Sequence, residues 1–324
     1  MKILFKRILR YALISLLIFC FIDFFLCRLI LHYGFNYDTK EFKLERSDVP
    51  YIEFTGKPFE LDHNELGYRG KAIKEASDSA IKILFFGGST GYYGNPTIAQ
   101  ILENDLKLAL NKDVFVANCS VVSSNHNQHL HALVEQFLDC KIDLVLFYGG
   151  YNENIQPLYY DPRPGYPFNY FYKHECSAWR LFLIKYSGFF GELEKRYRLV
   201  SGIKQLRYSY EQNQSKWQHS LKENYFKTLA KANIISKTSI KNTKDEPCKF
   251  IGFYQPYRVL DSYMKKSIES KKHIENIDYL FDISNCLDTI SNKANVYLDD
   301  VHVDANANNI IAHQISVIVQ KKLK

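Results

Sequence analysis

The sequence lacks paired cysteines. Its 324 residues include seven cysteines, none of which belongs to a Cys-x-x-Cys or Cys-x-x-His pair. Seven are too few for a disulfide scaffold, and without such pairs we expect no structural zinc site. The chain also has no internal repeat and no RNA-recognition, zinc-finger or helix-turn-helix signature. These absences exclude disulfide-stapled mini-proteins, zinc-stapled modules and the common readers of nucleic acid.

The composition is that of a folded chain with localised charge. Apolar residues make up 46% and aromatic residues 15%, which indicates a packed interior of one large domain or two small ones. The formal net charge of +7 is uneven. Residues 1–10 hold four basic and no acidic residues, and residues 171–235 hold twelve basic and five acidic ones, so the remainder is net acidic. We therefore expect no nucleic-acid partner.

The N-terminus contains the one long apolar run, residues 11–31. As a helix it is about 31 Å long, enough to cross a bilayer. We predict a single-pass transmembrane anchor over residues 11–32, after a basic cytoplasmic tail at residues 1–10. The basic tail predicts that the C-terminal domain lies outside the cytoplasm, in the periplasm or at the cell surface. A cleaved signal peptide is the alternative, although no small-x-small cleavage site follows the run.

One residue of this run, Asp23, is unusual because a carboxylate within a membrane span is costly. In one interpretation, Arg28 lies five residues away and extends to the membrane interface. In the other, Asp23 faces a second protein helix.

The rest of the chain alternates strand and helix patterns. We predict a stalk and lead-in over residues 33–80, then an α/β domain over 81–324 with a basic helical insertion at about 155–245. Short apolar runs predict strands at 81–87, 114–118, 142–148 and 249–254, and amphipathic periodicity predicts helices at 97–110, 128–140 and 310–323. Such alternation implies a central parallel sheet covered by helices on both faces, a three-layer fold.

Polar residues follow three of these strands, where open parallel sheets bind their ligands. They are Gly87-Gly88-Ser89-Thr90, Asn118-Cys119-Ser120-Val121-Val122-Ser123 and Gly149-Gly150-Tyr151-Asn152-Glu153. Near the C-terminus, Asp299 precedes His302 by three residues, a spacing that lets the carboxylate orient the ring and leave Nε2 facing a hydroxyl. Ser89 after a tight turn is a candidate nucleophile, although a serine there can also simply cap a helix.

In this order the motifs resemble those of the SGNH/GDSL hydrolases, in their membrane-anchored bacterial branch. The resemblance covers residues of about 60–320. It rests on Asn64-Glu65-Leu66-Gly67-Tyr68-Arg69-Gly70, ILFFGGSTGYYG, GGYNE, YQP at 254–256 and YLDDVHVDANANNIIA. It implies a flavodoxin-like fold and a Ser89–His302–Asp299 triad. It also implies an oxyanion hole formed by the N–H groups of Ser89 and Ser123 and the side chain of Asn152.

The sequence departs from the family pattern at three positions. Ser123 and Ala307 stand where the family usually has glycine, and Glu153 stands where it usually has aspartate. Only a backbone N–H is needed at position 123, but a serine is strained there if the position requires a positive φ.

Several residues have simpler interpretations. Asp300 is the alternative to Asp299, and we expect it to be a loop or capping carboxylate. His126, His129 and His131 are spaced unlike a metal site, and we expect solvated histidines. Cys119 is expected to be a small core residue. The basic section is interpreted as a helical cap over the site or as a surface for anionic glycans or lipid headgroups.

The sequence therefore predicts a membrane-anchored serine esterase without cofactor or metal. Its expected substrate is an O-acyl, above all O-acetyl, ester on a cell-surface glycan, or another small ester. An O-acyltransferase of the same triad, a lipid esterase and a catalytically silent glycan-binding scaffold are the alternatives.

Overall fold

The computed structural model describes residues 2–33, 46–49, 51–153, 187–189, 225–258, 277–288, 290 and 296–323. The chain divides into two compact units. One comprises Met1–Leu44 and Tyr170–Gln212, and the other comprises Glu45–Asn169 and Asn213–Lys324. Most of the predicted basic insertion at 155–245 lies outside the described residues.

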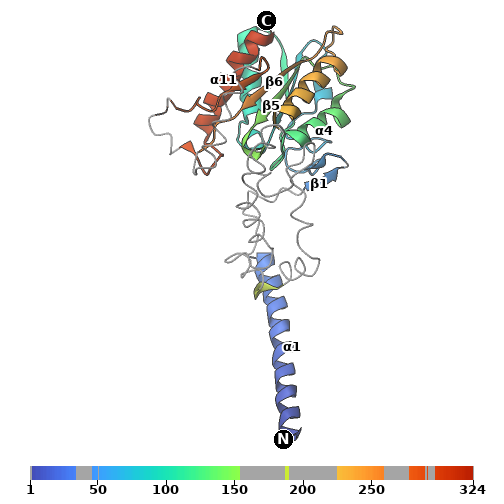
Figure 1. The fold of residues 1–324 in the computed structure, drawn as a ribbon, viewed down its shortest axis with the longest axis vertical. Helices are drawn as coiled ribbons and strands as arrows, with labels where there is room; N and C mark the ends of the chain where they lie inside the picture. Colours follow the sequence, from blue (N-terminus) through green and yellow to red (C-terminus); the bar gives the residue numbers. More distant parts are fainter. Residues whose placement is uncertain are drawn as a thin grey trace. The chain divides into compact units, whose positions relative to one another are not determined.

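The larger unit is built on a five-stranded parallel sheet with the order β4-β3-β5-β6-β7. Figure 1 shows β5 and β6 of this sheet side by side. The strands are β3 (Ile81–Gly87), β4 (Val114–Asn118), β5 (Leu144–Gly149), β6 (Lys249–Tyr254) and β7 (Leu280–Asp282). Counted along the chain, this is the order 2-1-3-4-5 of flavodoxin-like folds.

Helices cover both faces of this sheet, because side chains alternate along each strand. Leu84 and Phe86 of β3 belong to a core that contains side chains of α4 (His126–Phe137) and of the helical residues 225–239. Ile83 and Phe85 belong to the opposite core, which contains side chains of α3 (Ile98–Leu110) and α11 (Ala305–Leu323). The predicted three-layer α/β fold with a central parallel sheet is confirmed.

The predicted elements agree closely with the structure. The strands over 81–87, 114–118 and 249–254 are confirmed, whereas β5 begins two residues later than predicted and ends at Gly149. Helix α3 begins after the N-cap Thr97. Helix α4 begins two residues before the prediction, and α11 begins five residues before it.

Several short elements were not predicted. β1 (Arg46–Val49) and β2 (Glu53–Gly56) form an antiparallel hairpin within the predicted stalk and lead-in. A short 3-10 helix, η1 (Ile73–Glu75), and the three-residue strand β7 were also missed. Ile52, Phe54 and Tyr68 join the core under α4, so this part of the lead-in packs against the sheet.

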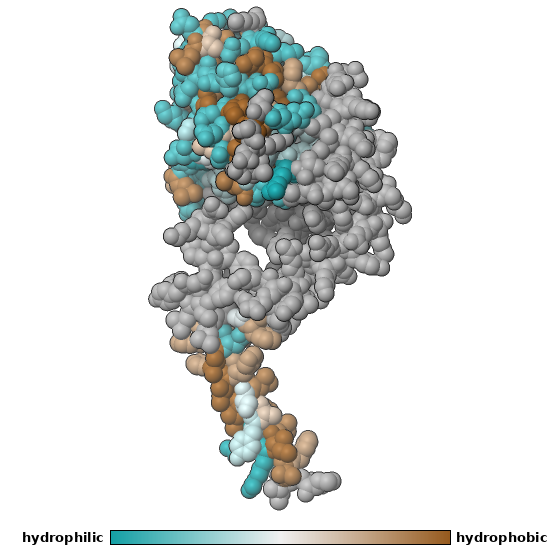
Figure 2. All heavy atoms as spheres, turned by 90° about the vertical axis from the view of Figure 1, so that its left-hand side faces the viewer, coloured by the Kyte–Doolittle hydropathy of each residue, from teal (hydrophilic) through white to brown (hydrophobic). Residues whose placement is uncertain are grey.

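The smaller unit contains helix α1 (Lys2–Tyr33). Among the described residues, Leu4–Phe25 is the one stretch long and apolar enough to cross a membrane, a property it shares with signal sequences. Its large apolar side chains are exposed along the helix (Figure 2).

Asp23 of α1 has partners within the same unit. Its carboxylate accepts hydrogen bonds from the Ser187 hydroxyl and, at 2.8 Å, from the N–H of Phe189. The Phe189 ring packs edge-on against Phe19, at 6.2 Å between centroids. Asp23 is therefore satisfied by a later segment of its own chain. The side chain of Arg28, the alternative partner, lies outside the described residues.

Candidate active site

Ser89 lies where β3 ends at the carboxyl edge of the sheet. It is the first residue of the short helix α2 (Ser89–Tyr92), and the N-cap position is taken by Gly88, so Ser89 is not the capping residue. The helices that follow β3 and β4 cover opposite faces, which places the topological switch point between β3 and β5. Ligand sites of such sheets lie in that crevice.

Asp299 and His302 pair directly. Asp299 Oδ2 lies 2.6 Å from His302 Nδ1, and Oδ1 accepts the N–H groups of Val301 at 2.8 Å and His302 at 2.7 Å. Partial burial acts to raise the pKa of Asp299, but these N–H groups and the His302 ring outweigh it and hold the pKa below its usual value. An ionised carboxylate at Nδ1 fixes the proton there and leaves Nε2 as the basic nitrogen.

His302 Nε2 is the basic nitrogen of this pair, and it is buried without a hydrogen-bond partner among the described residues. The imidazole packs edge-on against Tyr93, at 5.5 Å between ring centroids. Tyr93 is the C-cap of α2, and its N–H donates to the Ser89 carbonyl at 2.8 Å. The structure thus brings His302 to the helix that begins with Ser89, without a hydrogen bond between Nε2 and Ser89.

Asn152 reaches the same turn from the end of β5. A Cβ at position 88 would lie 2.8 Å from Asn152 Nδ2, so Gly88 admits the amide beside the candidate nucleophile. Asn152 Nδ2 donates to the Ser124 carbonyl at 2.7 Å. An amide has two N–H groups, and this bond uses one of them.

Ser123 follows β4 and adopts φ = 64°, in the left-handed region. The family pattern has glycine at this position, and the conformation explains that preference. A serine there carries strain of about 1 kcal/mol or more. The strain anticipated from the sequence is therefore present, and serine, unlike proline, has the backbone N–H that this position requires.

Asp300, the alternative orienting residue, does not contact His302 through a described bond. Its carbonyl accepts the N–H of Arg258 at 2.7 Å, which joins this loop to the segment that follows β6. Ala307 is fully buried in α11, where its N–H donates to Asp304 Oδ1 at 2.9 Å.

Arg69, from the lead-in, holds the chain that follows Ser89. Its Nη1 donates to the carbonyls of Tyr92 at 2.7 Å and Gly94 at 3.1 Å, and its guanidinium pairs with Asp62. Its Cζ lies 5.2 Å from the centroid of the Tyr92 ring. These bonds give the lead-in motif a role in fixing α2.

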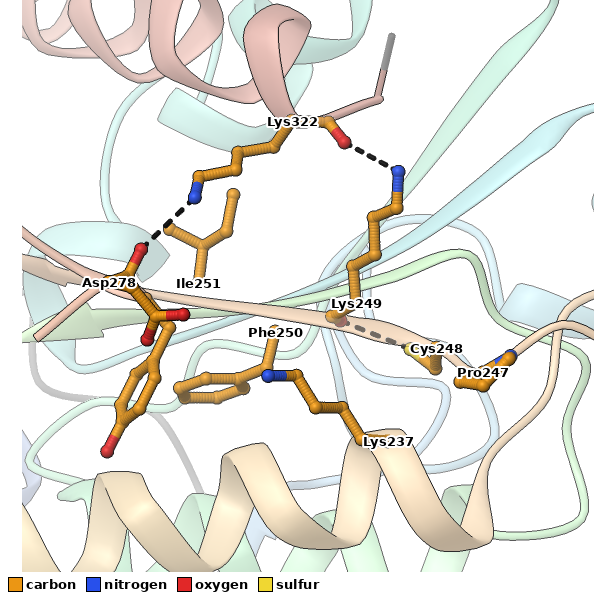
Figure 3. Close-up of a pocket in the computed structure, with 9 residues that line it drawn as sticks. Lys237, Pro247, Cys248, Lys249, Phe250, Ile251, Asp278 and Lys322 are labelled. Atoms are coloured by element: carbon orange, nitrogen blue, oxygen red, sulfur yellow. Dashed lines mark hydrogen bonds between the residues drawn. The ribbon is translucent and has the colours of Figure 1, made fainter.

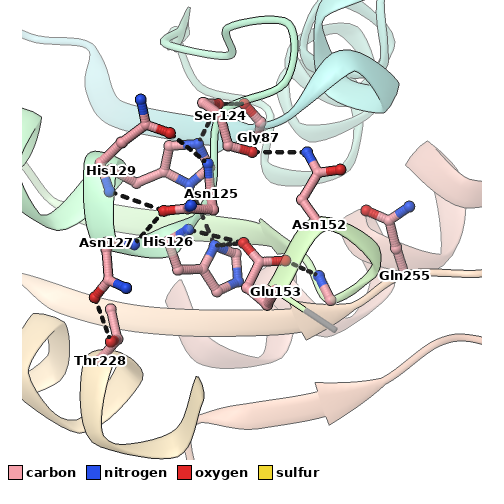
Figure 4. Close-up of polar contacts among 12 residues, drawn as sticks. Gly87, Ser124, Asn125, His126, Asn127, His129, Asn152, Glu153, Thr228 and Gln255 are labelled. Carbon is pink, nitrogen blue, oxygen red and sulfur yellow. Dashed lines mark hydrogen bonds and ion pairs between the residues drawn. The ribbon is translucent and has the colours of Figure 1, made fainter. Parts of the chain in front are cut away.

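The histidines of α4 correct one prediction. His126 is 1% exposed and His129 is 3% exposed, so neither is solvated, while His131 is half-buried. His126 Nδ1 lies 3.2 Å from both Glu153 Oε1 and His129 Nδ1 (Figure 4). Among the described residues, no group of three or more metal-ligating side chains is arranged to hold an ion.

Burial governs the charge of this cluster. It lowers the pKa of His126 and of His129 to about 3, so both imidazoles are neutral near pH 7. Burial also raises the pKa of Glu153, against the N–H groups that stabilise its carboxylate. Cys119, which follows β4, is also buried, and burial raises the pKa of its thiol, as expected for a core residue.

A hollow of about 380 Å³ lies at the ends of the strands away from Ser89, where β6 begins (Figure 3). Three lysines contribute to its lining: Lys237, Lys249 and Lys322. Lys249 Nζ donates to the Lys322 carbonyl at 2.6 Å, and Lys322 Nζ donates to the Asp278 carbonyl at 3.1 Å. Lys249 thus caps the C-terminal end of α11.

Comparison with known proteins returns solved structures alone. No protein-family model matches the sequence, and no curated protein matches it significantly. Similar structures include a lipase from a goat rumen metagenome, with 14% identity, a TM-score of 0.44 and coverage of 74% of this chain and 97% of the lipase. A lipase/acylhydrolase from Enterococcus faecalis has 13% identity, a TM-score of 0.42 and coverage of 75% and 97%. An acetylxylan esterase from Geobacillus stearothermophilus has 14% identity, a TM-score of 0.41 and coverage of 73% and 93%.

Proposed function

We propose that the protein is a serine ester hydrolase in which Ser89 is the nucleophile, His302 the general base and Asp299 the residue that orients His302. The observation that carries this proposal is the 2.6 Å pairing of Asp299 with His302 Nδ1. It leaves Nε2 as the basic nitrogen, with no hydrogen-bond partner in the described part of the chain, close to the helix that begins with Ser89. Hydrogen bonds between base and nucleophile are often long before substrate binds.

The proposed reaction has two halves. His302 Nε2 takes the proton of Ser89 as Oγ attacks the ester carbonyl, and the same proton then passes to the departing alcohol. Water, deprotonated by His302, hydrolyses the acyl-enzyme, which releases the acid and restores Ser89. The N–H groups of Ser89 and Ser123 and the second N–H of Asn152 stabilise the oxyanion, and losing one donor costs about 10²–10³ in rate.

The proposed substrate is an O-acyl, above all O-acetyl, ester on a cell-surface glycan. We propose that α1 is an uncleaved anchor and that the sheet-containing unit is extracytoplasmic, which would bring it to such polymers. A transferase of the same triad would pass the acyl group to a sugar hydroxyl instead of water. Release of free acetate without an added sugar acceptor identifies the hydrolase.

Fluorophosphonate labelling of the full-length chain in detergent tests the nucleophile. We expect labelling of the wild type and of Ser120→Ala, a serine variant in the loop after β4, and none of Ser89→Ala. Turnover of p-nitrophenyl acetate should fall by at least about 10⁴-fold in Ser89→Ala. Persistent labelling of Ser89→Ala would assign the nucleophile elsewhere. An unlabelled wild type with native circular dichroism would contradict a hydrolase and favour a silent scaffold.

A further inference from the structure

The Asn152 amide, a proposed oxyanion donor, is oriented by a single acceptor among the described residues, the carbonyl of Ser124. Ser124 is itself held in place. Its hydroxyl lies 2.7 Å from the Val121 carbonyl, 3.1 Å from the Gly87 carbonyl and 2.7 Å from His129 Nε2, and the residue is 3% exposed. A carbonyl can only accept, so the single hydroxyl proton is directed to the carbonyls and His129 Nε2 is the donor to the hydroxyl oxygen. His129 therefore fixes the acceptor of the Asn152 amide.

Glu153, the residue after Asn152, holds the backbone turn that carries this asparagine. Its Oε2 accepts the N–H of Gly150 and its Oε1 accepts the N–H of His126, both at 2.7 Å. Gly150 has φ = 122°, so the turn between β5 and Asn152 has a conformation that few residues adopt. The Glu153 carboxylate spans this turn and ties it to the first residue of α4, where a helix N-terminus favours negative charge.

These bonds form a closed path. It runs from Asn152 to Ser124, to His129, to His126 through the 3.2 Å contact between their Nδ1 atoms, to Glu153 and back along the chain to Asn152 (Figure 4). The path is surrounded by aromatic rings, with Phe86 5.8 Å from His129 and Phe147 5.2 Å from His126. In such apolar surroundings each polar group depends on its partners, because removing one of them leaves another buried and unpaired.

We propose that Glu153 and His129 are positioning residues of the oxyanion hole that act through Asn152. The proposal rests on the proposed ester hydrolase function. No catalytic step uses Glu153 or His129 directly. In this proposal both residues hold the second N–H of the Asn152 amide toward the oxyanion.

A double-mutant cycle on the full-length chain tests this role. Glutamine at 153 keeps the size of the side chain but presents a donor NH₂ where one of two N–H groups needs an acceptor. We expect Glu153→Gln to lower kcat for p-nitrophenyl acetate about tenfold with little change in KM, and Asn152→Ala to lower kcat about 10²–10³-fold. In the double variant, Glu153→Gln should add no further loss, because its route through Asn152 is gone. Losses that multiply would overturn the proposal.

Ser124→Ala is the milder second variant if Glu153→Gln does not fold. It retains the carbonyl that Asn152 contacts and removes the hydroxyl that His129 contacts, so we expect a several-fold loss of kcat that disappears in the Asn152→Ala background. Equal losses in both backgrounds would contradict the proposal.

Glu103→Gln is the matched control, because Glu103 also accepts a backbone N–H, that of Val116 at 2.9 Å, but from α3. Its kcat should stay unchanged. A wild type that is neither labelled nor active would refute the proposed function, and this inference with it. A labelled, active wild type with multiplying losses would refute the inference alone.

Discussion

Asp299 holds three hydrogen bonds at once, two from backbone N–H groups and one from the His302 ring. Asp299→Asn separates these tasks. The amide oxygen still accepts the backbone N–H groups, so the loop should keep its shape, but the NH₂ group faces Nδ1 and favours the tautomer whose Nε2 carries the proton. We expect kcat for p-nitrophenyl acetate to fall by up to about 10⁴-fold with an unchanged unfolding temperature.

Asp300→Asn is the control for this prediction, since its side chain makes no described contact with His302. Its kcat should match that of the wild type. A larger loss in Asp300→Asn than in Asp299→Asn would transfer the orienting role to the neighbouring carboxylate.

At the scale of single residues, contacts between residues close in the sequence could be predicted, whereas contacts between distant residues could not. The Asp299–His302 contact follows from a three-residue spacing, and the strain at Ser123 follows from a departure from glycine. The burial of His126 and His129 did not follow from sequence, because their carboxylate partner, Glu153, lies beyond the next strand. No local pattern signals a pairing of this kind.

At the scale of elements, prediction succeeded where side chains are buried on both faces of the sheet. Strand β3 contains the uninterrupted apolar run of residues 83–86 and could be recognised without an alternating pattern. The hairpin of β1 and β2 was missed because its residues, RSDV and EFTG, are largely polar. Strand β7 has three residues, too few to show a period.

Helix α4 leads to a pH prediction, because two of its histidines are buried and neutral. With pKa values of about 3 in the folded state and about 6.5 when unfolded, each takes up a proton on unfolding below about pH 6.5. The unfolded state then binds more protons, so stability falls as pH falls, by up to about 1.4 kcal/mol per pH unit for each histidine. Glu153 has the opposite effect. Because burial raises its pKa in the folded state, its carboxyl group binds at most one proton more in the folded state and favours that state in acid.

Thermal unfolding of the full-length chain between pH 7.5 and 5 measures the balance. Two histidines outweigh one carboxyl group, so we expect a lower unfolding temperature at pH 5. His129→Gln should weaken this dependence. The exposed His313, 73% accessible in its side chain, is the control, and His313→Gln should leave the dependence intact. An unfolding temperature that rises toward pH 5 would mean that the histidines are not held neutral.

At the scale of the whole molecule, the proposed topology has a direct test. If α1 is an uncleaved anchor, the mature protein keeps the mass of the full chain and stays in membranes after an alkaline carbonate wash. A membrane-impermeant reagent should label a C-terminal tag on cells whose outer layers are permeable and whose inner membrane is intact. A mature mass lacking the first residues would identify a cleaved signal peptide. Labelling that requires lysis would reverse the orientation.

The bond between Asp23 and the segment at Ser187 and Phe189 bears on how this protein is engineered. Chimeric membrane proteins commonly treat the anchor as an interchangeable part, chosen for length and hydropathy alone. Here an unrelated apolar helix would leave the Ser187 hydroxyl and the Phe189 N–H without their acceptor. A transplant that retains Asp23 and Phe19 at their helical spacing preserves those contacts, so α1 and the segment at Ser187 and Phe189 are best exchanged as a pair.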